Sequence, residues 1–164
     1  MKTKKLTLLS LLTAIALTIF MVEAQIPIPI PGVKLGLANI VTLFALYLLG
    51  PWDALIILLL RCSLGCILTG QPSTFLYSIT GGILSLLVML LLKNMTTEHQ
   101  IFAVSVFGGI AHNIGQILAA ALITHTPGLV YYLPVLLIAG VLAGIFTGFT
   151  AQYLIHHLQK LMQK

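Results

Sequence analysis

Long apolar runs with almost no charge fill this chain and constrain its fold more than any other feature. Of its 164 residues, 59% are hydrophobic and only 7% are charged, whereas a soluble domain carries about 25% charged residues. A helix needs about 20 apolar residues to cross a bilayer. The sequence therefore predicts an all-α, polytopic membrane protein, with no room for a soluble domain.

Turn signals divide the apolar sequence into six predicted spans within one membrane domain, 1–164. Gly50-Pro51, residues 69–73 and residues 125–128 are typical of turns, and residues 93–100 form the most polar loop. The predicted bundle of six transmembrane helices has spans at about 6–23, 34–49, 52–68, 74–92, 101–124 and 129–154. In the last span, the spacing of four between Gly140, Gly144 and Gly148 favours close helix packing.

The basic residues predict the orientation. Cytoplasmic loops of membrane proteins carry an excess of Lys and Arg, and six lysines fall on one side of a six-span arrangement: Lys2, Lys4, Lys5, Lys93, Lys160 and Lys164. We therefore expect both termini in the cytoplasm and interpret the formal charge of +5 as orientation, not as nucleic-acid binding. A signal peptide cleaved after residues 22–24 is the alternative for the first run, which is longer than a typical signal core.

A proline-rich stretch separates the first two predicted spans. Pro27, Pro29 and Pro31 exclude a helix, because each lacks the backbone N–H and makes the preceding residue extended. Gly32 then allows a turn, and Lys34 follows at the head of the next span. We expect this stiff loop to face outward and to cover a small-molecule site.

Polar side chains collect in the outer halves of the predicted spans, whereas the inner halves are apolar. Because polar groups are costly in a bilayer, they usually face a cavity or a partner. A pore would need a polar lining along its whole length, so the asymmetry predicts a cavity that opens outward and is sealed below. The candidate substrate-binding residues are Glu23, Lys34, Asn39, Arg61, Tyr77, His112, Asn113, Gln116 and Tyr131.

Span 101–124 carries the densest polar pattern. Gly108, His112 and Gln116 are spaced by four, with Asn113 beside them, so they form one stripe on a helix. The stripe favours ligand contact, and a network of hydrogen bonds between helices is the alternative.

Arg61 needs an anionic partner inside the membrane. Asp53 and Glu98 fall on the cytoplasmic side, which leaves Glu23 as the internal partner; an acidic group on a ligand is the alternative. Lys34 belongs either to the outer surface or to the same site. With Lys34 and Arg61 against Glu23, the pocket is positive overall and favours a small anionic or zwitterionic ligand with an apolar body.

Several kinds of chemistry lack their motifs in the sequence. There is no G-x-x-x-x-G-K-[ST] loop for ATP, and no cluster of metal ligands, so we expect neither a metal nor another cofactor. Cys62 and Cys66 share one helix face within an apolar run and favour packing over a disulfide. His99, His125, His156 and His157 are expected in solvent or at the membrane interface.

Glu23, the run PGVKLGLAN at 31–39, Arg61, Gly81-Gly82, AHNIGQ at 111–116 and YYLP at 131–134 occur in this order. Together they resemble the Gx transporter family, also labelled heptaprenyl diphosphate synthase component I. The resemblance implies similarity to the substrate-binding S components of energy-coupling factor (ECF) transporters, in the plasma membrane of a bacterium. Such proteins have six helices and bind a micronutrient near the outer face, under the loop between helices 1 and 2.

The resemblance also implies partners. S components dock through small residues of helix 1 onto a shared transmembrane subunit that carries two ATPases, and Ser10, Ala14 and Thr18 occupy the corresponding stripe here. Packing of this stripe within the chain's own bundle is the alternative. Prenyl chain elongation holds a diphosphate through Mg²⁺ on paired carboxylates, and three scattered acids do not supply such pairs. We therefore expect no enzyme. A secondary carrier that uses Glu23 as its proton site and a non-catalytic accessory subunit of a polyprenyl diphosphate synthase are the alternatives to an importer subunit.

Overall fold

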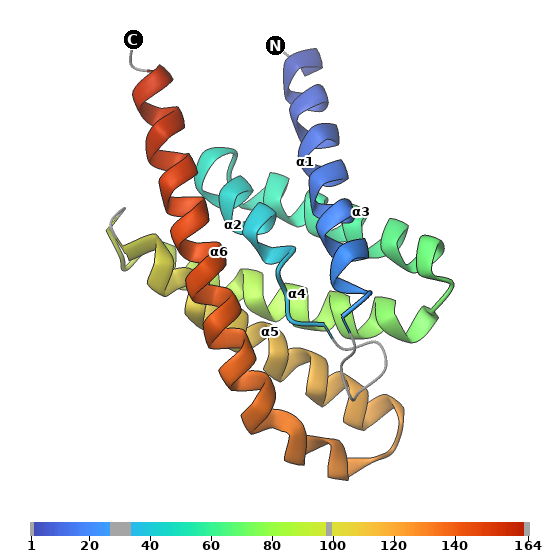
Figure 1. Ribbon diagram of the computed structural model, residues 1–164. Helices are drawn as coiled ribbons and strands as arrows, with labels where there is room; N and C mark the ends of the chain where they lie inside the picture. The colour runs from blue at the N-terminus through green and yellow to red at the C-terminus, as the bar shows by residue number, and fades with distance from the viewer. Residues whose placement is uncertain (1, 27–33, 98–99, 163–164) are drawn as a thin grey trace.

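The computed structural model describes residues 2–26, 34–97 and 100–162, and every regular element in these ranges is helical (Figure 1). The proline stretch at 27–31, Gly32, Glu98 and His99 lie outside the described residues. The elements are α1 (Lys2–Glu23), α2 (Asn39–Leu48), α3 (Pro51–Thr69), α4 (Pro72–Lys93), α5 (Ile101–Ile123), the 3₁₀ helix η2 (Pro127–Tyr132) and α6 (Leu133–Met162).

In the described ranges, five helical segments are long and apolar enough to cross a bilayer: α1, α3, α4, α5 and the continuous η2–α6 segment. The predicted span 34–49 differs, because its helix, α2, begins only at Asn39 and has 10 residues. At 1.5 Å per residue, α2 rises about 15 Å, roughly half of a hydrocarbon core. The structure confirms an all-helical, multi-pass membrane protein, whereas six full spans and cytoplasmic termini stay predictions.

The described start of α1 and the described end of α6 lie at the same end of the molecule (Figure 1). We call this the terminal end. Two lysines fix the neighbouring helices there. The Lys5 ammonium lies 2.9 Å from the Asp53 carboxylate at the start of α3, and Lys93 Nζ donates a 2.8 Å hydrogen bond to the Leu46 carbonyl near the end of α2. Asp53 is thus on the side where the sequence placed it.

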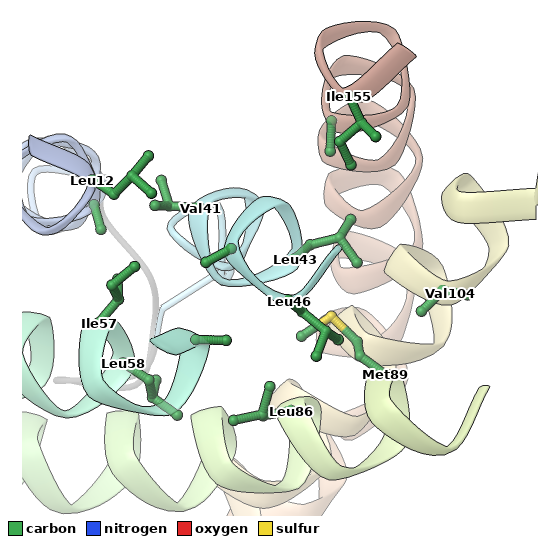
Figure 2. Close-up of a cluster of buried hydrophobic side chains, with 14 of the residues drawn as sticks. Leu12, Val41, Leu43, Leu46, Ile57, Leu58, Leu86, Met89, Val104 and Ile155 are labelled. Carbon is green, nitrogen blue, oxygen red and sulfur yellow. The ribbon is translucent and has the colours of Figure 1, made fainter. Parts of the chain in front are cut away.

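The main apolar core surrounds α2. Figure 2 shows Leu43 and Leu46 of α2 among side chains from the other helices. Every α-helix contributes to this cluster, including Cys62 of α3, so one short central helix joins the whole bundle. Its members from the other helices include Leu12, Ile57, Leu58, Leu86, Met89, Val104 and Ile155.

Glycines bring α5 close to both α4 and α6. A Cβ atom added at Gly115 would lie 2.8 Å from the Gly81 Cα atom of α4, and one at Gly109 would lie 2.7 Å from the Gly140 carbonyl oxygen of α6. Gly144 and Gly148 likewise pack on the α5 backbone. The predicted packing role of the glycine stripe in α6 is therefore confirmed, and the side chains of α5 are positioned by backbone contact on two sides.

Candidate functional site

Residues 34–38 form a non-helical segment inside the bundle, between the end of α1 and the start of α2. We call it the cover segment. Backbone at membrane depth must find hydrogen-bond partners within the protein, because lipid supplies none. Its last residues do so locally, since the carbonyl of Gly36 accepts from Asn39 N at 2.9 Å and that of Leu37 accepts from Ile40 N at 3.1 Å. Gly36 has φ +87°, a conformation that favours glycine.

Glu23 supplies acceptors for the cover segment. Its carboxylate oxygen Oε1 accepts a hydrogen bond from the Gly36 N–H and a second, of 3.2 Å, from the Leu37 N–H. Glu23 is the last residue of α1 and is only 2% exposed. Hydrogen bonds to a charged acceptor are stronger than neutral ones, so Glu23 fastens the cover segment to the end of α1.

Gln116 and His112 hold the cover segment from α5. Gln116 Oε1 accepts a 2.7 Å hydrogen bond from the backbone N–H of Lys34, so the Gln116 Nε2 atom is the donor that faces His112 Nε2. His112 Nε2 must therefore be an acceptor, and the histidine is neutral with its proton on Nδ1. These two side chains of α5 thus hold the backbone of the cover segment.

The Lys34 side chain is buried against α1. Its Nζ atom donates to the Phe20 carbonyl at 3.3 Å and lies 3.0 Å from the centroid of the Phe20 ring. A cation is stabilised over an aromatic face and at the carbonyl end of a helix. Gly65 of α3 leaves room for this ring, since an added Cβ would collide with it. Lys34 therefore belongs to the buried site and not to the outer surface.

Arg61 contacts Asn39 rather than Glu23. Arg61 Nη2 donates a 2.7 Å hydrogen bond to Asn39 Oδ1 at the start of α2. In the part of the chain that the structure describes, the ion pair found is that of Lys5 with Asp53, so the internal pair expected between Arg61 and Glu23 is not formed. The Glu23 carboxylate accepts from the cover segment instead.

These contacts join into one polar layer, which we define as Glu23, Lys34, Asn39, Arg61, His112 and Gln116. Each of these residues is at most 7% exposed. Gly36 links the two halves of the layer, because a Cβ added to it would lie 2.7 Å from His112 Cδ2 and 3.0 Å from Asn39 Nδ2. Among the described residues, the cover segment thus occupies the place where the sequence predicted an outward cavity.

Three predicted site residues lie beside the layer or away from it. Asn113 donates through Nδ2 to the Leu136 carbonyl of α6. Tyr77 is buried in a second apolar cluster with Ile117 and Ala120. Tyr131 is 89% exposed in η2 and is not brought together with the others.

Comparison with known proteins identifies the family. The sequence profile of the family described as heptaprenyl diphosphate synthase component I matches residues 12–154. This chain belongs to that family. A solved S component of a bacterial ECF transporter shares the fold of this component I chain, with a TM-score of 0.78 and 21% sequence identity over 100% of both chains. No curated protein matches the chain.

The matched range of the component I family contains the entire polar layer. The layer of this component I chain offers hydrogen bonds and charge but no metal site, since the described residues include no group of three or more His, Cys, Asp or Glu side chains that could hold a metal ion. Glu23 and Asp53 also lie apart. Glu23 is the last residue of α1, whereas Asp53 of α3 pairs with Lys5 near the first residue of α1. They do not form the paired carboxylates that bind a diphosphate through Mg²⁺.

The sequence did not predict two residues that contact or position the polar layer, Phe20 and Gly36. Phe20 binds the Lys34 ammonium, because its carbonyl accepts a hydrogen bond from Nζ and its ring lies under the charge. Gly36 provides an N–H donor for Glu23 and packs closely against His112. Phe20 looks like any apolar residue of a span, so no local signal distinguished it. Gly36 did carry a signal, because a glycine between Lys34 and the polar Asn39 is typical of a break in the helix.

Proposed function

We propose that this chain is the substrate-binding membrane subunit, or S component, of an energy-coupling factor importer. The observation that carries the proposal is the polar layer, in which three charged side chains and three amide or imidazole groups meet inside an apolar bundle. Groups of this kind are costly in a membrane and usually mark a substrate path. The shared fold with a solved S component supports the same function.

The proposed substrate is a small micronutrient, or a quinone or isoprenoid precursor, that carries an anionic group. The substrate enters from the outer side when the cover segment moves. The segment has to move because its backbone fills the space between Asn39 and His112. The cover segment is fastened by few contacts, the side chains of Glu23 and Gln116 among them. Such a segment opens without unfolding the core around α2.

The proposed partners are a transmembrane subunit and its two ATPases, which would dock on α1. Ser10, Ala14 and Thr18 are exposed on one side of this helix. Ser10 and Ala14 line a groove of about 350 Å³ between α1 and α3, and Thr18 lines a second groove of about 440 Å³ farther along the same two helices. Small residues allow close approach of a partner helix in a membrane.

Two measurements test the proposal together. Native mass spectrometry of the purified chain identifies a co-purified small molecule and its charge. Uptake of that molecule into proteoliposomes is then measured for the chain alone and for the chain with the transmembrane subunit and ATPases. We expect uptake only with the partners and ATP. Uptake by the chain alone along an ion gradient would instead identify a secondary carrier.

The family description favours a second candidate, a non-catalytic accessory subunit of a polyprenyl diphosphate synthase. This candidate predicts that the chain co-purifies from membranes with a soluble prenyl synthase and changes the length of its product. An unchanged product length when the chain is deleted, together with ATP-dependent uptake, eliminates it.

A further inference from the structure

The three charged side chains of the polar layer are not equally satisfied. Glu23 accepts two backbone hydrogen bonds, and Lys34 is held by the carbonyl and the ring of Phe20. Arg61 bonds only to the neutral carbonyl oxygen of Asn39 among the described residues. Its guanidinium is always charged and 98% buried, since it is 2% exposed. Arg61 is thus the cation whose charge the protein leaves without a counter-charge in contact.

Two donors beside this bond have no acceptor. In the described part of the chain, Arg61 Nε and Asn39 Nδ2 are both buried and without a hydrogen-bond partner. Buried donors are normally satisfied, and each exception calls for an explanation. Because both open atoms are donors, the missing group is an acceptor. Because one of them belongs to a cation, the acceptor that fits best is an anion.

Within the described ranges, neither carboxylate is in contact with Arg61. The acids in the described residues are Glu23, which accepts from the cover segment, and Asp53, which pairs with Lys5. A guanidinium binds carboxylate and phosphate oxygens through paired N–H groups, and Arg61 has used only one nitrogen.

We propose that Arg61 and Asn39 form a receptor for one oxyanion, a carboxylate or a phosphate, on the transported molecule. The inference rests on the proposed substrate-binding function and assigns the anion to Arg61 rather than to Lys34. The ligand's oxygen atoms accept from Arg61 Nε and Asn39 Nδ2. Gly36 packs closely against Asn39, since a Cβ added to Gly36 would lie 3.0 Å from Asn39 Nδ2. The Gly36 backbone must therefore move to admit the ligand.

The sequence offers a direct reporter, because Arg61 is the only arginine in the chain. Protein labelled with ¹⁵N-arginine gives a single Nε–H signal in detergent micelles. We expect benzoate or phenyl phosphate to shift this signal in a saturable manner, and the neutral isostere benzamide to leave it in place. Equal shifts with benzamide, or no saturable shift with either anion, would overturn the assignment.

Variants test the two donors separately. Each variant is titrated with the same anions, and the rise in its unfolding temperature measures binding. Arg61→Gln should weaken anion binding about 100-fold and Asn39→Ala about tenfold, as expected for buried hydrogen bonds to charged groups. Lys160→Gln, which removes one positive charge from an exposed position near the end of α6, is the matched control and should bind normally. If Arg61→Gln does not fold, the ¹⁵N titration of the unaltered chain still decides.

The outcomes separate this inference from the importer function. A co-purified molecule without a carboxylate or phosphate overturns the receptor but leaves ATP-driven import intact. Saturable anion binding at Arg61 without ATP-driven import removes the importer and keeps the receptor. A shift caused by phosphatidylglycerol micelles but not by soluble anions identifies a lipid headgroup and overturns the transported ligand.

Discussion

Glu23 differs from an ordinary intramembrane acid because the backbone, not a cation, satisfies it. The N–H groups of Gly36 and Leu37 donate to its carboxylate, and both precede α2, so no carbonyl of that helix accepts from them. Gln116 does the same for Lys34. At this scale, two side chains from distant parts of the sequence satisfy backbone N–H groups that precede a half-length helix.

Glu23→Ala should destabilise the protein by about 2–4 kcal/mol, because it leaves two buried N–H groups without an acceptor. Glu23→Gln keeps an acceptor oxygen and should cost about 1 kcal/mol. Thermal or denaturant unfolding in detergent micelles measures both. Lys5→Gln, which breaks an ion pair whose lysine is largely exposed, serves as a control and should cost less than 1 kcal/mol. Equal losses for Ala and Gln would contradict the acceptor role.

His112 should be neutral and carry its proton on Nδ1, because Gln116 donates to Nε2. Two-dimensional ¹⁵N NMR of histidine-labelled protein distinguishes this tautomer, and His112→Gln identifies the signal. Gln116→Leu should release the constraint and return the ring to a mixture of tautomers. A charged His112 at neutral pH would show that the orientation of the Gln116 amide is reversed.

At the scale of elements, the contact of α4 with α5 depends on glycine. Gly115→Ala should destabilise the bundle by about 1–3 kcal/mol, because its Cβ would meet the Gly81 Cα atom at 2.8 Å and overpacking has costs of this size. Gly128→Ala in η2, where nothing lies within 4 Å of an added Cβ, should be nearly neutral. Unfolding midpoints compare the two, and a neutral Gly115→Ala would mean that α4 and α5 separate easily.

The exposed side of α1 leads to a prediction about assembly with a partner rather than about stability. If the proposed importer docks on α1, Ala14→Trp should abolish assembly with its transmembrane subunit and leave the stability of the isolated chain unchanged, because Ala14 is exposed and lines the groove between α1 and α3. Ile138→Trp, at a 65% exposed position of α6, is the control of equal bulk. Co-purification with the partner subunit measures assembly. Normal assembly of Ala14→Trp would place the docking surface elsewhere.

For the whole molecule, hydropathy predicted α3, α4 and α5 to within a few residues, because length and apolar composition are local properties. It could not predict where α2 begins. Residues 34–38 are compatible with a helix apart from Gly36, and their conformation depends on Glu23 and Gln116, which are distant in the sequence. The sequence predicted which residues form the polar layer, but not which of them contact one another. Arg61 with Asn39 is a tertiary pairing that spacing does not reveal.

Tyr131 illustrates the same limit at the other end of the chain. Its position at the outer end of the last predicted span suggested a place near the site, but that part of the chain forms η2 and leaves the tyrosine at the surface. Conversely, the buried hydroxyls of Ser105 and Thr147, 2.9 Å apart between α5 and α6, lie in inner halves that we took to be apolar. Short polar side chains are satisfied there without any ligand.

The two hydrogen bonds from the cover segment to Glu23 have a mechanical consequence. Glu23 is the final residue of α1, so one carboxylate couples the backbone of the cover segment to the helix that also bears Ser10 and Ala14. Residues 36 and 37 can shift only by breaking both bonds or by pulling the tip of α1 along with them. A displacement that keeps both bonds therefore also alters the surface that α1 presents to the surrounding membrane.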